Sequence, residues 1–84
     1  MKKYGWLRLN MKLQRIDKAE QLLLDLGFNQ LIVRIHDDVT RIELDPSQFG
    51  KFMEEAIRTE VYKKIKEFGF SYVALDVLGY AQEV

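Results

Sequence analysis

Two arginines and two carboxylates are the residues of this chain that could do chemistry together. Arg34, Arg41, Glu43 and Asp76 fall at alternate positions of three short segments rich in apolar and β-branched residues. In a small sheet, this two-residue period brings all four to one face. Guanidinium groups bind phosphate or carboxylate through paired hydrogen bonds, and a neighbouring carboxylate can orient them. The spacing therefore predicts an anion site built by Arg34 and Arg41 and oriented by Glu43 and Asp76.

Two other interpretations fit the same face. In the first, the charges form an ordinary solvated surface whose cross-strand ion pairs add little stability. In the second, another subunit covers the face, which explains why Ile32, Val39 and Tyr72 lie among the charges at the same period. The sequence leaves the three interpretations open.

His36 and Glu20 are further candidates for the site or for an interface. His36 is the one histidine and lies beside the Asp37-Asp38 pair. Such a residue more often belongs to a turn than to a metal or catalytic site, because a metal or a proton relay needs further partners. Glu20 could share a hard divalent cation with the carboxylates of the sheet face, but it is also explained as a helix-capping residue. We expect no metal and no cofactor.

Composition excludes several classes of function. The 84 residues are 48% hydrophobic and contain 13 basic residues, 13 acidic residues and no cysteine. A chain without net charge lacks the general attraction that drives nucleic-acid binding, and one without cysteine has no disulfide scaffold or thiol nucleophile. No P-loop, dinucleotide fingerprint or nucleophile–base pair occurs, so we expect no catalysis by this chain alone. No signal peptide or membrane span is evident, so we expect a cytoplasmic protein that does not bind membranes.

One structural unit occurs twice in the chain. Each copy is an amphipathic helix that ends in Gly-Phe, at Gly27-Phe28 and at Gly69-Phe70, and is followed at once by a strand. The glycine can take the left-handed conformation that closes the last helical turn, and the phenylalanine can fold back over the helix end. The unit predicts two helix ends and two strand starts. When its two copies are aligned, Arg34 and Asp76 occupy equivalent positions.

The start of the chain has its own pattern. We expect residues 1–14 to form an extended N-terminal segment or connector, because their apolar residues alternate loosely. Residues 15–84 are expected to form a single domain. Asp17 is predicted to cap a helix over residues 17–26, with Glu20 as its capping-box partner.

The middle of the chain carries a second helix-start signal. Asp45, Pro46 and Gln48 supply the cap, the first helical residue and the capping-box partner. A shift in the phase of the apolar residues then divides the helical region into residues 46–53 and 54–68. Strands are expected at residues 30–36, 39–44 and 72–77. The order α-β-β-α-β predicts an α+β fold, a small mixed three-stranded sheet with both main helices on one face and the other face open.

Four motifs, taken in this order, resemble one known family. They lie at residues 16–20, 26–36, 40–43 and 69–80. Together they resemble the C-terminal domain of the LarE-type, ATP-dependent sacrificial sulfur transferases, and the likeness runs from residue 15 to residue 80. The run Leu75-Asp76-Val77-Leu78-Gly79-Tyr80 is similar to the Leu-Asp-Leu-x-Gly-Tyr ending of that family.

The resemblance implies an enzyme in which a PP-loop domain adenylates a pyridinium mononucleotide carboxylate and a protein cysteine then yields its sulfur. The product of that chemistry feeds a nickel-pincer cofactor. Neither the PP-loop nor a cysteine occurs in this sequence, so neither step is expected of it. The resemblance also implies that Arg34 corresponds to a basic residue of an anion-binding strand. Glu20 and Glu43 stand at acidic positions that lie near a cation or a subunit contact in that family.

Two departures from the family affect the anion site. Ile32 stands where a second arginine is common, and residues 81–84 replace an Arg-x-Gly-Ser segment. We therefore expect a non-catalytic accessory or oligomerisation module that self-associates or docks on a separate PP-loop protein. The alternative is a module that binds the phosphate or carboxylate of a nucleotide-like molecule through Arg34 and Arg41.

Overall fold

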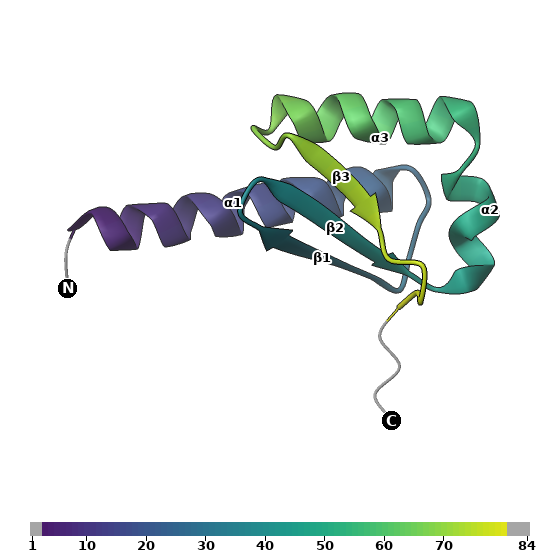
Figure 1. Cartoon of the computed structure of the whole chain (residues 1–84), viewed down its shortest axis with the longest axis horizontal. Helices are drawn as coiled ribbons and strands as arrows, with labels where there is room; N and C mark the ends of the chain where they lie inside the picture. Colours follow the sequence, from purple (N-terminus) through teal and green to yellow (C-terminus); the bar gives the residue numbers. More distant parts are fainter. Residues whose placement is uncertain (1–2, 81–84) are drawn as a thin grey trace.

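The chain folds into a three-stranded sheet with its helices packed against it (Figure 1). The computed structural model describes the backbone of residues 3–80 and the side chains of residues 13–80. In chain order the elements are α1 (Lys3–Asp25), β1 (Leu31–His36), β2 (Val39–Leu44), the 3-10 helix η1 (Pro46–Gln48), α2 (Phe49–Phe52), α3 (Glu55–Glu67) and β3 (Tyr72–Leu75). This confirms the predicted α+β fold with the order α-β-β-α-β.

The sheet is mixed and has β2 in its centre. β1 pairs antiparallel with β2 through the hairpin turn at Asp37-Asp38, and β3 pairs parallel with β2 after the crossover through α2 and α3. The turn also holds β3 in place, because the carbonyl oxygen of Asp38 accepts a hydrogen bond of 2.9 Å from the Ser71 N–H. All three strands are therefore tied together at the hairpin end of the sheet.

The hydrophobic core lies between one sheet face and the helices. Val33 and Ile42 project from the strands into the same buried cluster as Leu23 of α1 and Ile65 of α3. Because successive strand residues point to opposite faces, the neighbours of these core residues lie on the uncovered side of the sheet. Both long helices thus leave one face open, as the sequence predicts.

The two Gly-Phe junctions have the same local structure. Gly27 and Gly69 have φ angles of 93° and 107°, and the phenylalanine after each glycine is buried. Each ring also lies beneath a cation from another helix. The Lys51 Nζ is 4.8 Å from the Phe28 ring centroid, and the Arg15 guanidinium carbon is 5.6 Å from that of Phe70. A left-handed glycine, a buried ring and a cation therefore close both helix ends.

The extended conformation expected near the N-terminus is wrong. Helix α1 begins at Lys3 and continues to Asp25, so Asp17 lies inside the helix and does not cap it with Glu20. Residues 6–16 contain no glycine or proline and are rich in Leu, Lys, Arg, Met and Gln, which favour helix. Residues 1 and 2 lie outside the described part of the chain, and the role of residues 1–14 as a connector stays a prediction.

The second helical region divides as expected, with one difference at its start. A break after Phe52 separates α2 from α3, and the Asp45 carboxylate caps η1 by accepting a hydrogen bond of 3.0 Å from the Ser47 N–H. Gln48 is not the capping-box partner of Asp45. Its side-chain amide instead bonds the backbone of Asn29, with one contact of 2.5 Å to the carbonyl oxygen and one of 3.0 Å from the N–H. Gln48 therefore fixes the chain between α1 and β1.

Candidate functional site

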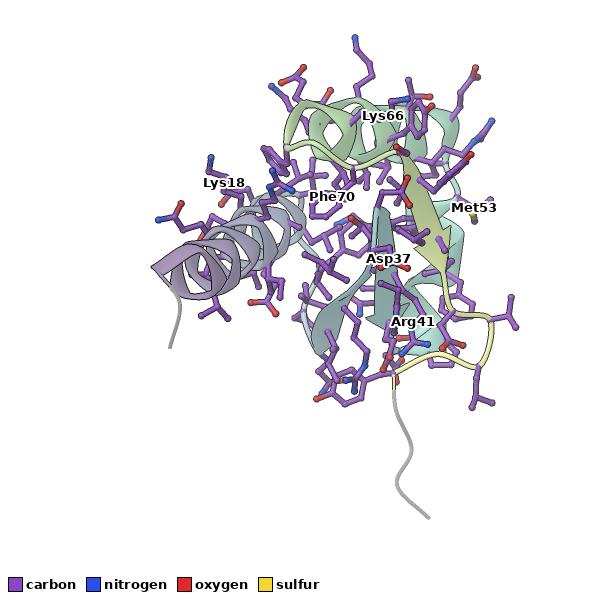
Figure 2. All side chains as sticks on the ribbon, turned by 60° about the vertical axis from the view of Figure 1, so that its left-hand side comes forward. Lys18, Asp37, Arg41, Met53, Lys66 and Phe70 are labelled. Atoms are coloured by element: carbon purple, nitrogen blue, oxygen red, sulfur yellow. The ribbon has the colours of Figure 1, made fainter. Side chains whose placement is uncertain are left out.

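The strand register brings the predicted charged residues to one sheet face. Arg34 of β1 lies opposite Arg41 of β2, and Glu43 lies one alternate position farther along β2. Figure 2 shows Arg41 on the side of the strands away from α1 and α3, whereas Phe70 lies between these helices. We call this uncovered side the open face. Its other strand residues are Ile32, His36, Val39, Tyr72 and Ala74.

A charged cluster of three residues forms the centre of the open face. The Arg34 Nε and the Arg41 Nη2 donate hydrogen bonds of 2.8 Å and 3.1 Å to the same carboxylate oxygen, Oε2 of Glu43. The Glu43 side chain is 5% exposed, whereas the side chains of Arg34 and Arg41 are 47% and 36% exposed. The cluster therefore combines one buried negative charge with two partly exposed positive charges.

Two buried polar atoms of the cluster have no hydrogen-bond partner among the described residues. They are the second carboxylate oxygen of Glu43, Oε1, and the Nε of Arg41. Burial of an unpaired polar atom costs stability, and the cost is larger for a charged group. The contacts of Arg34 and Arg41 with the carboxylate are thus needed to keep the Glu43 charge inside the protein.

The arrangement leaves donors available at the surface. A guanidinium group has five N–H donors, and each arginine gives one of them to Glu43 in the contacts described above. The remaining donors of Arg34 lie on a side chain that is nearly half exposed. The cluster can therefore contact an anion or an acidic protein surface without first losing its bond to Glu43.

Asp76 and Glu20 do not join the cluster. Asp76 follows the last residue of β3, and its Oδ1 accepts a hydrogen bond of 2.9 Å from the Leu78 N–H. It closes a turn after β3, and its role in supporting the arginines stays a prediction. Glu20 lies on α1, which packs on the opposite side of the sheet. The internal repeat places Asp76 on the same face as Arg34 but does not predict its hydrogen-bond partner. Strand β3 ends at Leu75, so Asp76 belongs to the turn that follows the strand.

His36 lies exposed at the end of β1, beside the hairpin turn. Among residues 13–80, whose side chains are described, no group of three or more His, Asp or Glu residues is placed to hold a metal ion. Within the described helices, none is long and apolar enough to cross a membrane.

The turn after β3 is a feature that the sequence pattern missed. Val77 and Leu78 are 89% and 75% exposed, although both are apolar. Gly79 follows with a φ of 98°, and a Cβ at this position would lie 2.9 Å from the Pro46 Cγ. The pair Asp76 and Gly79 could have signalled this turn, since Asp often accepts a hydrogen bond two residues on and Gly tolerates positive φ.

Comparison with known proteins finds relatives for this chain but no matching family model. The chain is 34% identical over 77 residues to pyridinium-3,5-bisthiocarboxylic acid mononucleotide synthase from Lactiplantibacillus plantarum, a match that covers 92% of this chain and 27% of the synthase. It is 44% identical over 69 residues to an uncharacterized protein from Synechocystis, covering 82% of this chain and 26% of that protein. The chain thus spans about a quarter of the length of the curated relatives it matches.

Proposed function

Because this chain is related to a LarE-type synthase, we propose that it is a non-catalytic accessory module, similar to the C-terminal domain of these sulfur transferases. It acts by associating with a second copy of itself or with a separate protein that carries a PP-loop domain. Its contact surface is the open face, with Arg34, Arg41 and Tyr72 as the contacting residues.

Coverage is the observation that carries this proposal. Nearly the whole chain aligns with the synthase, yet the alignment includes only 27% of that protein. The PP-loop and the cysteine that the resemblance associates with sulfur transfer do not occur in these 84 residues. A module of this size therefore needs the activity of another polypeptide segment if it takes part in such chemistry.

The composition of the open face supports association. Tyr72 is 63% exposed on the strand next to β2, and the arginines of the charged cluster lie on the same face. Tyrosine and arginine are enriched at the centres of protein interfaces, where they supply large contact areas and several hydrogen-bond donors. The half-buried Ile32 and Val39 add apolar area between these polar residues.

Light scattering at micromolar concentration tests the proposal, with this chain alone and mixed with a purified PP-loop protein that lacks the corresponding segment. We expect a complex in at least one sample, and we expect Tyr72→Glu to weaken it by at least about tenfold, as for an interface residue worth more than 1.4 kcal/mol. Tyr62→Glu is the matched control, because Tyr62 is 48% exposed on α3, outside the open face. A strict monomer that binds no PP-loop protein contradicts the proposal.

Binding of a small anion is the second candidate function. It is favoured by the partly exposed donors of Arg34 and by the two positive charges that share one carboxylate. The ligand would carry a phosphate or carboxylate, as a nucleotide does, since both groups accept paired hydrogen bonds from arginine.

Thermal unfolding with a panel of nucleotides tests this second function. We expect a nucleotide to raise the Tm of the native chain and of Arg58→Ala, a control on α3, but not that of Arg34→Ala. A ligand that binds only the folded state stabilises it by mass action. An unchanged Tm across the panel excludes the nucleotide version of this function.

A further inference from the structure

The N-terminal part of α1 extends beyond the rest of the domain. Figure 1 shows the first half of this helix projecting past the sheet and past α3. Ala19 is the first buried residue of α1 among the described side chains, and Leu13 is 52% exposed. We call residues 3–14 the arm and residues 17–80 the body.

Charge is distributed unequally along the chain. The first 16 residues contain five basic residues and no acidic one, and Asp17 is the first acidic residue of the chain. The remaining residues contain eight basic and 13 acidic residues, which gives them a net charge of −5 and balances the +5 of the N-terminal part. A chain that is neutral overall is therefore strongly polarised along its length.

Apolar positions follow two separate lines along the arm. The first line consists of Trp6, Leu9 and Leu13, and the second of Tyr4, Leu7 and Met11. Both have the spacing i, i+3, i+7 that places residues on one side of a helix. A helix lying on a lipid surface needs one broad apolar face opposite a polar one. Two narrower lines suit a protein surface that contacts the helix from two sides.

We propose that the arm docks on the acidic body of a second copy of this chain. The arm contains three basic residues and no acidic one, and the body contains eight basic and 12 acidic residues. Their contact therefore brings opposite charges together, whereas pairing two arms would bring like charges together. The body also offers exposed apolar residues for the arm, including Val77 and Leu78 in the turn after β3. Figure 1 places this turn at the end of the molecule away from the arm.

This inference goes beyond the proposed function: it adds a self-association contact outside the open face and leaves the open face as the contact for a PP-loop protein. The open face carries Arg34 and Arg41, which disfavour contact with a basic arm. Variants of the arm and of the open face therefore report on different contacts, and either proposal can fail without the other.

Sedimentation of the full chain at about 0.05 M and about 0.5 M salt tests the contact between arm and body, since surface charges are weakly screened at the lower salt concentration and strongly screened at the higher. We expect association at micromolar concentration that weakens at least about tenfold at the higher salt. The double variant Arg8→Glu with Lys12→Glu should be monomeric at both. The control, Lys63→Glu with Lys64→Glu on α3, has the same net charge as the arm variant but a more acidic body, and should associate at least as strongly as the native chain. Circular dichroism checks that both variants keep their helix content.

Any of four sedimentation outcomes overturns the inference. They are a monomeric native chain at low salt, an arm variant that still associates, an equal loss in the arm and control variants, and association that is insensitive to salt. Arm-dependent binding of a monomer to vesicles of anionic lipid also overturns it, in favour of a lipid surface. If Tyr72→Glu abolishes association and the arm variant does not, the open face stands and the arm contact is rejected.

Discussion

The two faces of the sheet use the same strands for different purposes. In β2, Ile42 is fully buried against the helices, whereas its neighbours Arg41 and Glu43 belong to the charged cluster of the open face. Apolar burial is the main source of folding stability, and exposed arginine and tyrosine side chains add little to it. The residues of one strand thus alternate in role: those on the covered face supply stability, and those on the open face are available for recognition.

Truncation of the covered face should have the largest effect. Ile42→Ala removes a buried side chain from the centre of the core, and such a change costs about 2–5 kcal/mol. Tyr72→Ala on the open face should change the free energy of unfolding by less than about 0.5 kcal/mol. Urea denaturation followed by circular dichroism measures both. Similar losses at the two positions would mean that the faces do not differ in the way described.

Glu43 is the residue that could break this division, because it lies on the open face and is buried. Glu43→Gln removes the negative charge that accepts hydrogen bonds from both arginines, and should cost about 1–3 kcal/mol of unfolding free energy. Glu55→Gln, at an exposed position of α3, is the control and should have little effect.

A double-mutant cycle sharpens the assignment of this effect. In a chain that already carries Arg34→Ala, Glu43→Gln should cost less than in the native chain, because one of the two ion pairs is gone. Equal costs in both backgrounds would show that the Arg34–Glu43 contact adds nothing to stability.

The faces of the sheet could be predicted because they depend on a short-range rule. Alternation along each strand places its apolar core residues on the helix side, and so assigns Arg34, Arg41 and Tyr72 to the other side. Positive φ at Gly27 and Gly69 follows from the Gly-Phe junctions. The shared contact with Glu43 could not be predicted in the same way. That contact depends on the strand register and on side-chain conformation. The end of β3 at Leu75 also matters, because it places Asp76 in a turn outside the cluster.

Helix α1 shows the limit of local signals. Asp17 and Glu20 satisfy the capping-box spacing, but that spacing also occurs inside helices, and the helix-forming residues before Asp17 allow α1 to continue. The Asp45 signal succeeds because Pro46 follows it, since proline lacks an N–H and is favoured in the first turn. A cap is therefore predicted more securely when a second residue excludes continuation of the helix.

The smallest predicted effect concerns Asp45, which follows β2 at the point where the chain leaves the sheet for the crossover. Hydrogen bonds from the Ser47 hydroxyl and the Ser47 N–H hold the pKa of the Asp45 carboxyl below its usual value of 3.8. The stability that the ionised carboxylate contributes is fully present above a pH of 3.8 and is lost as the pH falls through the lower pKa of the folded state.

Asp45→Asn should therefore reduce the loss of stability on acidification, while keeping a side-chain oxygen that can cap η1. Thermal unfolding between pH 2 and pH 6, a range chosen to span the usual pKa of about 4 for aspartate, measures this change. Asp37→Asn removes a carboxylate from the hairpin turn without touching the Asp45 cap, and is the matched control. If both variants have the native acid dependence, the cap at the exit of β2 contributes nothing to it.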